Sequence, residues 1–411
     1  MEERSTGADE GAGAFRATLS GLCASLVGIG LARFAYTPLI PALISAQWFT
    51  PSEAAYLGAA NLAGYLAGAL LAGRAAGRLP PARTLRAMMA LATVAFFACG
   101  LPLSFVWFFV WRFASGVAGG MLMVLAAPIV LLRVPPRRRG LAGGVIFTGV
   151  GLGIALSGTL VPPLLEAGLT EAWCGLGALA LLLTLLAWNG WPADRPPLLA
   201  ARPRHHTPQA GLALIALFAA YGLNAVGLVP HMVFLVDFVA RDLGKGVEAG
   251  ASYWVLFGLG ATAGPVLAGH LADRIGFRPA LRFAFLIQAA LVASLAVAHD
   301  PAVLAVSSVV IGACAPGIVP LALGRVQELV PADPSGRGQA WSIATTAFAI
   351  GQAAAAYGFS FLIAQDGSYA LMFGLGAAAL LAALAIDLAA AASAGRTGGR
   401  LRPPARKERD R

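Results

Sequence analysis

Two arginines lie within long apolar stretches, where a charged side chain requires a partner. Arg33 is about fifteen residues into a stretch that begins near residue 18, and Arg112 is about a third of the way into another. At a helical rise of 1.5 Å per residue, Arg33 is roughly 22 Å along its helix and near the middle of a bilayer. Burial there costs on the order of 2.5–3.5 kcal/mol. We therefore expect Arg33 to bind an anionic ligand or a coupling acid, with a structural hydrogen-bond role as the alternative.

Three further polar residues fit the same kind of site. Tyr36 follows Arg33 by nearly one helical turn and shares its face, although core packing explains it equally well. Asn224 and His231 are seven residues apart in a later apolar stretch, so they share one helix face. His231 is able to carry a proton, and a neutral histidine satisfied by a neighbour is the alternative.

The 19 acidic residues are informative because none occupies the middle of an apolar stretch. The nearest are Asp237, Glu328 and Asp387, each close to the end of a stretch. Asp237 precedes Arg241 by four residues, which predicts an ion pair at the surface. A site for lipophilic cations needs a buried carboxylate, so this pattern favours an anionic or polar neutral ligand.

The composition defines the class of protein that holds these residues. Hydrophobic residues make up 58% of the 411 residues, charged residues make up 12%, and the mean hydropathy is +0.76. Apolar stretches of 18 or more residues recur throughout, and each is long enough to cross a bilayer as a helix. The net charge of +10 resides in short loops, so it predicts contact with the lipid bilayer and no nucleic-acid binding.

Neither a cofactor nor a metal is predicted, and the chain is not expected to be an enzyme. The four cysteines are scattered and lack metal-ligand spacing. The pair His205 and His206 lies in a polar linker, where solvation is the simplest interpretation. We find no HExxH motif, P-loop or Ser/His/Asp cluster.

The hydropathy pattern predicts an all-α polytopic membrane protein with twelve transmembrane helices in two six-helix bundles. We expect a tail at 1–16, a first bundle at 17–191, a linker at 192–209, a second bundle at 210–392 and a basic tail at 393–411. The predicted helices are 17–45, 53–73, 84–103, 105–132, 141–164, 171–191, 210–238, 250–272, 280–298, 302–324, 338–363 and 367–392.

The basic residues test this count. All but four of the 29 lysines and arginines fall in loops or tails on the side shared by both termini. Basic residues accumulate in cytoplasmic loops, so an even number of spans with both termini in the cytoplasm is predicted.

The two halves resemble each other at a spacing of about 190–200 residues. The first span contains GLARFAYTP at 30–38 and the seventh contains GLNAVGLVP at 222–230. The fifth span opens with RGLAGG at 139–144 and the eleventh with RGQAWS at 337–342. Internal duplication with a ligand site near the midplane is typical of transporters. The duplication does not extend to charge, because Ala225 corresponds to Arg33.

The loop GHLADRIGFR at 269–278 resembles the GxxxDRxGxR signature of the major facilitator superfamily, on Gly269, Asp273, Arg274, Gly276 and Arg278. Its glycines permit a tight turn and its arginines suit the cytoplasmic face. The resemblance implies a cytoplasmic gating loop, which we expect to latch near Arg139 and Gly140 at the start of the fifth span. The counterpart in the first half has Gly73 in place of the acid, so only the second half keeps the full motif.

Two other motifs refine the resemblance. Arg112 to Gly116 is similar to the RxxxG motif of the superfamily, which is often tied to proton coupling. The segment GIGLARFAYTPLIPAL at 28–43 resembles the YbfB/YjiJ-like branch, a group of bacterial proteins classed as probable transporters.

The resemblance implies a secondary transporter of a small molecule, working by alternating access as a monomer in the bacterial inner membrane. We expect its central site to be lined by Arg33, Tyr36, Arg112, Asn224 and His231, and its substrate to be an organic anion or polar metabolite, with a possible coupling proton. The alternatives are a proton-coupled drug or metabolite exporter and, more distantly, a membrane sensor that transports nothing.

Overall fold

The computed structural model describes residues 2–131, 133–135, 139–192, 208–330 and 334–399, and every regular element in this part of the chain is a helix. Twelve helical segments there are long and apolar enough to cross a membrane, which confirms the predicted number. Each half of the sequence supplies six of them. The predicted linker lies almost entirely outside the described residues.

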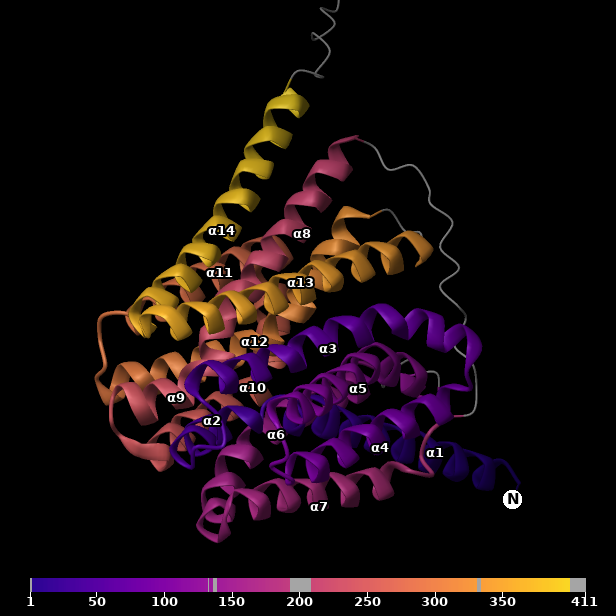
Figure 1. Cartoon of the computed structure of the whole chain (residues 1–411). Coiled ribbons are helices and arrows are strands. Elements are labelled where there is room, and N and C mark those ends of the chain that lie inside the picture. The colour runs from indigo at the N-terminus through magenta and orange to yellow at the C-terminus, as the bar shows by residue number, and fades with distance from the viewer. Residues whose placement is uncertain (1, 132, 136–138, 193–207, 331–333, 400–411) are drawn as a thin grey trace, which may run out of the picture.

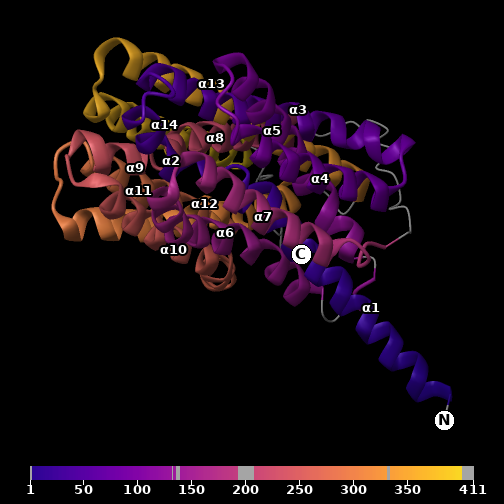
Figure 2. The same cartoon turned by 60° about the horizontal axis from the view of Figure 1, so that its bottom comes forward.

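The first six spans form what we call the N-half. The first span combines α1 (Glu2–Ser25), a π-helical turn η1 (Leu26–Leu31) and α2 (Tyr36–Ser45), so the residues expected as a tail already belong to α1. This helix projects from the bundle at its N-terminus (Figure 2). The remaining spans are α3 (Pro51–Arg78), α4 (Pro81–Cys99), α5 (Phe105–Leu131), α6 (Arg139–Ala167) and α7 (Leu169–Ala187).

The last six spans form the C-half. Its first span consists of α8 (Pro208–Val229), η3 (Pro230–Phe234), α9 (Leu235–Asp237) and η4 (Phe238–Asp242). The others are α10 (Gly246–Ile275), α11 (Phe277–Ser294), α12 (Pro301–Leu329), α13 (Pro334–Asp366) and α14 (Tyr369–Gly399).

The same backbone contacts between glycines and carbonyls recur in both halves. A Cβ at Gly64 of α3 would lie 2.1 Å from the carbonyl oxygen of Phe113 in α5, and a Cβ at Gly260 of α10 would lie 2.0 Å from that of Val309 in α12. Two more such pairs repeat with the offset of 196 residues that separates Gly64 from Gly260. Small residues allow this close approach of membrane helices. The contacts confirm the internal repeat in three dimensions.

The lead helix of each half is interrupted near its middle. In the N-half the regular helix gives way to η1 and a turn at 32–35 before Pro38, which has no N–H to bond the carbonyl four residues earlier. Thr37 bonds the Phe34 carbonyl instead, at 3.2 Å. In the C-half the change to π-helix begins at Pro230. These two prolines are the ones aligned in the sequence repeat.

The halves are packed together at one end and separated at the other (Figure 1). We call the end where α7 finishes and α8 begins the inner side. On the outer side a Cβ at Gly258 of α10 would lie 2.4 Å from the backbone nitrogen of Ala155 in α6. Near the inner ends of the same two helices, a Cβ at Gly143, Gly144 or Gly269 would meet nothing within 4 Å.

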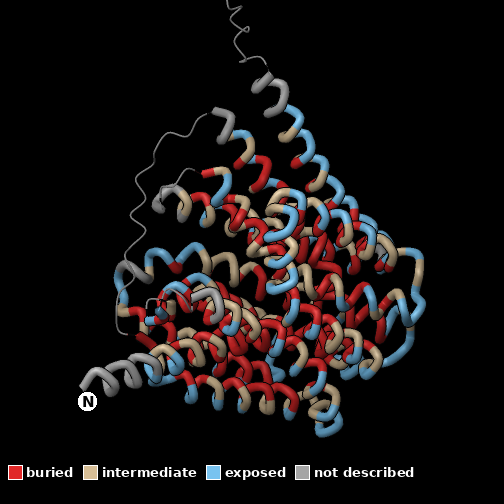
Figure 3. Tube along the Cα trace, turned by 180° about the vertical axis from the view of Figure 1, so that it is seen from behind, coloured by how far each residue is buried: buried red, intermediate tan, exposed pale blue. Residues whose placement is uncertain are grey.

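Burial follows the two bundles and leaves an apolar exterior. Buried positions run along the interior of each half and across the outer contact (Figure 3). Many large side chains on the outward helix faces, such as Leu182, Leu185 and Leu267, are exposed. An apolar exterior around a helical bundle is what lipid contact requires.

Candidate functional site

Arg33 lies in the turn that interrupts the first span, and its charge is not neutralised within the described residues. Its guanidinium carbon is 5.1 Å from the ring centroid of Phe34 and 5.2 Å from that of Tyr65 in α3. The residue is partly exposed, and its buried Nη2 has no hydrogen-bond partner. Two ring faces stabilise a cation, but neither fills the hydrogen-bonding capacity of a guanidinium. The arrangement is suited to accepting an anionic ligand.

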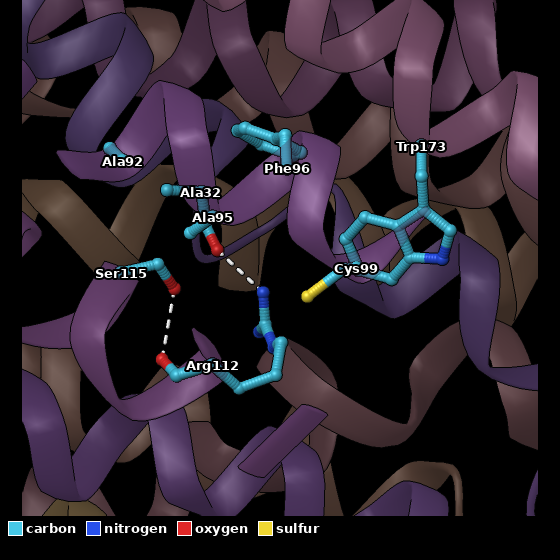
Figure 4. Close-up of a pocket in the computed structure, with 8 residues that line it drawn as sticks. All are labelled: Ala32, Ala92, Ala95, Phe96, Cys99, Arg112, Ser115 and Trp173. Carbon is cyan, nitrogen blue, oxygen red and sulfur yellow. Dashed lines mark hydrogen bonds between the residues drawn. The ribbon is translucent and has the colours of Figure 1, made fainter. Parts of the chain in front are cut away.

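Arg112 is placed differently, inside the N-half (Figure 4). It is 3% exposed, and its Nη1 donates to the carbonyl oxygen of Ala32 at 2.8 Å. That carbonyl belongs to the interruption of the first span, directly before Arg33. The guanidinium also lies over the ring of Tyr36, at 4.2 Å from its centroid. Arg112 therefore supports the interrupted helix, while Arg33 contacts different residues.

Tyr36 is also engaged within the N-half. Its hydroxyl donates to the carbonyl oxygen of Ala54 at 2.7 Å, and the residue is 2% exposed. The structure thus brings Tyr36 together with Arg112, as a ring under a guanidinium, and leaves Arg33 apart from this pair.

An asparagine that the sequence analysis did not single out completes this cluster. Asn61 of α3 donates through Nδ2 to the Arg112 carbonyl oxygen at 3.2 Å and to Ser115 Oγ at 2.8 Å. A Cβ at Gly116, the glycine of the RxxxG motif, would lie 2.0 Å from the Asn61 carbonyl oxygen. A lone asparagine in an apolar helix was the available signal for this contact.

In the C-half, Asn224 points towards α11. It is fully buried, and its Nδ2 donates to Gln288 Oε1 at 3.0 Å, while its Oδ1 has no partner. Gln288 Nε2 in turn donates to the Ala284 carbonyl oxygen at 2.9 Å. This pair joins α8 to α11 inside the C-half.

His231 is also buried, and it bonds α12. Its Nε2 is 2.8 Å from Ser307 Oγ, and that hydroxyl donates to the Leu291 carbonyl oxygen at 3.1 Å. Since the single hydroxyl proton is used there, Nε2 must carry the proton and donate to Ser307. His231 Nδ1 is then a buried acceptor without a partner, and the ring meets Phe373 edge-on at 5.5 Å.

The five predicted site residues therefore separate into three groups. Tyr36 and Arg112 form one cluster in the N-half, Asn224 and His231 bind separate partners within the C-half, and Arg33 stands alone at the interrupted turn.

Close to Arg33, three contacts join the two halves on the outer side. Thr37 Oγ1 donates to the Met232 carbonyl oxygen at 2.8 Å, which links the two interrupted spans. The ring of Phe34 is 5.9 Å from that of Trp254 in α10, and Trp254 Nε1 donates to Ser157 Oγ in α6 at 3.1 Å. We call Phe34, Trp254 and Ser157 the aromatic contact. Phe34 is thus shared between Arg33 and the boundary of the halves.

Asp237 forms the predicted ion pair with Arg241, but the aspartate is not at the surface as predicted. Its Oδ1 does accept from Arg241 at 3.1 Å, but the aspartate is 3% exposed and also accepts from the Tyr369 hydroxyl of α14. Its neighbour Phe238 packs on Tyr369 at 5.6 Å. The sequence spacing predicted the bond to Arg241, whereas Tyr369, the second partner of Asp237, is 132 residues away.

The signature loop lies at the inner end of the C-half. Asp273 and Arg274 are exposed, and within the described residues Asp273 forms no ion pair. Gly276 has φ of 87° between α10 and α11, which explains the need for glycine. Arg278 Nε lies 3.7 Å from Asp387 Oδ2 in α14. Arg139 and Gly140 begin α6, but the surroundings of these two residues lie outside what the structure describes, so the expected latch stays a prediction.

Comparison with known proteins agrees with this architecture. Residues 25–388 match the family model described as "Uncharacterised MFS-type transporter YbfB". An uncharacterized MFS-type transporter of Mycobacterium tuberculosis, found in two strains, is 27% identical over 267 residues. The match covers 62% of this chain and 58% of the relative, so the chain spans little more than half the length of these curated relatives.

Two solved structures share the fold. A D-xylose-proton symporter has a TM-score of 0.74 at 18% identity, covering 90% of this chain and 97% of the symporter. A bacterial homolog of the human lysosomal transporter Spinster, in an inward-facing and unoccupied conformation, has a TM-score of 0.68 at 16% identity. That match covers 96% of this chain and 99% of the homolog. At these identities the likeness extends to the fold alone.

Proposed function

Because the chain belongs to the YbfB family of MFS-type transporters, we propose that it carries a small organic anion across the membrane, with Arg33 as the residue that binds the anion. The observation that supports Arg33 most directly is its buried, unpartnered Nη2 at the interrupted turn of the first span. A guanidinium presents parallel N–H donors that match a carboxylate. Arg112, Tyr36, Asn224 and His231 then act as supports of the two interrupted spans.

The proposed mechanism is alternating access between the two halves. The aromatic contact and the Thr37–Met232 hydrogen bond close the outer side, while the inner ends of α6 and α10 stand apart. An anion arriving from the inner side would reach Arg33 and displace ring contacts of its guanidinium. Phe34 is one of those rings and also packs against Trp254. An anion bound at Arg33 would therefore change the packing of Phe34 at the aromatic contact.

We further propose that the protein acts as a monomer in the bacterial inner membrane with both termini in the cytoplasm. The placement of basic residues supports this orientation, because all but four of the 29 lie on the side of the termini. The inner side of the structure is then the cytoplasmic side.

Uptake by proteoliposomes tests the role of Arg33. The full-length protein and its Arg33→Gln, Arg33→Lys and Arg86→Gln variants are assayed with labelled p-aminohippurate, gluconate and citrate. A hydrogen-bonded charge contributes about 1.5–3 kcal/mol, so Arg33→Gln should slow uptake of the carried anion roughly 10- to 100-fold. Arg33→Lys should retain part of the rate.

Arg86→Gln is the matched control, since Arg86 bonds the Trp188 carbonyl oxygen at the inner end of the N-half, away from Arg33. It should leave the rate within about two-fold. Equal uptake by wild type and Arg33→Gln would refute the assignment of Arg33, and failure of the wild type to carry any of the three anions would count against an anionic substrate.

A further inference from the structure

Neither mid-span arginine forms an ion pair within the described residues, and both keep a buried N–H without an acceptor, but only Arg33 is partly exposed. Arg112 is 3% exposed, bonds the Ala32 carbonyl oxygen and lies over Tyr36. Other arginines of the described spans lie near helix ends, and some are paired with acids, as Arg241 is with Asp237 and Arg282 is with Asp387. A ligand bound at the interrupted turn therefore contacts one exposed guanidinium, that of Arg33.

The surroundings of that charge are aromatic. Phe34 and Tyr65 each present a ring to the Arg33 guanidinium at 5.1 and 5.2 Å. Phe34 continues into Trp254, whose ring stacks on Phe257 at 4.8 Å and an interplanar angle of 13°. Ring faces and edges bind apolar groups well and leave a hydrated polar group without partners. These surroundings favour a ligand whose body is apolar or aromatic.

Because Arg112 is 3% exposed, a second negative charge on the ligand would have no second exposed guanidinium to contact. Its desolvation would be uncompensated, which is strongly unfavourable in a site of low polarity. A neutral amide would bind more weakly for a different reason: its carbonyl oxygen is able to accept from Arg33 Nη2, but it brings no negative charge to compensate the guanidinium, and hydrogen bonds between ionised partners are the stronger ones. Charge and surroundings therefore select the same class of molecule.

We propose that the site is specific for monocarboxylates with an apolar or aromatic body, and discriminates against dicarboxylates and neutral amides of the same shape. This inference rests on the proposed function, since it names the class of anion that Arg33 binds. The carboxylate faces Arg33, and the body lies along the aromatic residues Phe34 and Tyr65.

Equilibrium binding to the purified full-length protein tests the proposal with two matched series. The aliphatic series is hexanoate, adipate and hexanamide, and the aromatic series is benzoate, terephthalate and benzamide. Within each series the skeleton is constant while the charge is −1, −2 or 0. Binding is measured by displacement of whichever labelled monocarboxylate binds more tightly, at fixed ionic strength. The monocarboxylate should bind at least 10-fold more tightly than its diacid and its amide.

Two variants separate failure of this inference from failure of the proposed function. Arg33→Gln should abolish the preference over the amide, and Arg33→Lys should preserve it. If a diacid binds as tightly as its monocarboxylate and Arg33→Gln weakens both, Arg33 binds anions but the single-charge selection is wrong. If Arg33→Gln changes no affinity, both proposals fall. If neither monocarboxylate binds the wild type, the monocarboxylate proposal is overturned.

Discussion

The N-half and the C-half share a scaffold but differ in their polar interiors. The glycine contacts of α3 with α5 recur between α10 and α12. At the inner ends, Arg86 bonds the Trp188 carbonyl oxygen at 2.7 Å, and 196 residues later Arg282 bonds Asp387 Oδ2 at 2.5 Å. Both halves have thus kept the close backbone contacts. Both also join two helices at the inner end, α4 to α7 in the N-half and α11 to α14 in the C-half.

The charges near the midplane have not been kept. Ala225 corresponds to Arg33, and Ser308, buried with an unpartnered Oγ, corresponds to Arg112 at the offset of the glycine contacts. Helix packing requires both halves to obey the same steric rule, whereas a single ligand requires only one cation. The comparison indicates that duplication determines the scaffold, and it is consistent with the proposal that the N-half binds the ligand.

The largest effect is expected from the shared glycines. Gly64→Ala and Gly260→Ala each force a Cβ to within about 2 Å of a backbone carbonyl oxygen. Overpacking costs typically about 1–3 kcal/mol, and we expect the upper end because backbone must move. Both variants should lower the apparent melting temperature in detergent by similar amounts, since the two contacts are equivalent.

Gly73→Ala and Gly269→Ala are the controls in the same two helices. Both positions are open, with nothing within 4 Å of an added Cβ, and they are related by the same offset. Neither should lower stability. A loss at Gly64 without a loss at Gly260 would contradict the equivalence of the two scaffolds.

The next largest effect distinguishes the polar interior of the N-half from that of the C-half. Arg112→Met removes a charged donor from the Ala32 carbonyl oxygen and should destabilise the protein by about 2 kcal/mol. Ser308→Ala removes a buried hydroxyl that has no partner, so its effect should be near zero or slightly stabilising. Chemical unfolding in detergent measures both. Equal losses would mean that Ser308 has a role that the comparison of the halves does not predict.

The fold was predictable because its signals are local. Stretch length, loop charge and the aligned segments correctly indicated twelve spans and the duplication, whereas the sequence analysis predicted 17–45 and 210–238 as continuous helices and missed the interruptions. Hydropathy did not reveal the π-helical turns, because such turns depend on which carbonyl oxygen accepts the hydrogen bond of each backbone N–H.

The site was predictable only in part, because sequence reveals a costly residue but not its partner. It identified Arg33 and Arg112 as charged residues within apolar stretches, yet only the structure shows that Arg112 bonds the Ala32 carbonyl oxygen, whereas Arg33 Nη2 has no partner. Helix-face reasoning placed Asn224 with His231, whose partners Gln288 and Ser307 lie on α11 and α12. Such partners are more than 60 residues away, beyond the reach of any spacing rule.

A smaller effect compares the side-chain bonds that join two helices at the inner end of each half. Arg282→Gln breaks a partly buried ion pair with Asp387 and should cost about 1 kcal/mol, since partial exposure weakens such pairs. Arg86→Gln loses a bond to a carbonyl and a ring contact with Trp188, and should cost less. Unfolding at low and high salt separates them, because only the ion pair should weaken as salt increases. If both variants showed the same salt dependence, the ion pair between Arg282 and Asp387 would not explain the stability lost in Arg282→Gln.

The smallest effect concerns the boundary where the halves meet. Trp254→Phe keeps a ring against Phe34 but removes the hydrogen bond to Ser157, worth about 1 kcal/mol net and so roughly a five-fold shift towards an open outer side. The measurement is the labelling rate of Val233→Cys by an impermeant maleimide from the outer side, with the four native cysteines replaced by alanine. Trp173→Phe is the matched control, because Trp173 is buried within the N-half and its indole N–H has no partner. Ser157→Ala should reproduce the effect of Trp254→Phe and add nothing to it. If labelling is unchanged in both, or if Trp173→Phe accelerates it equally, the aromatic contact does not hold the halves together.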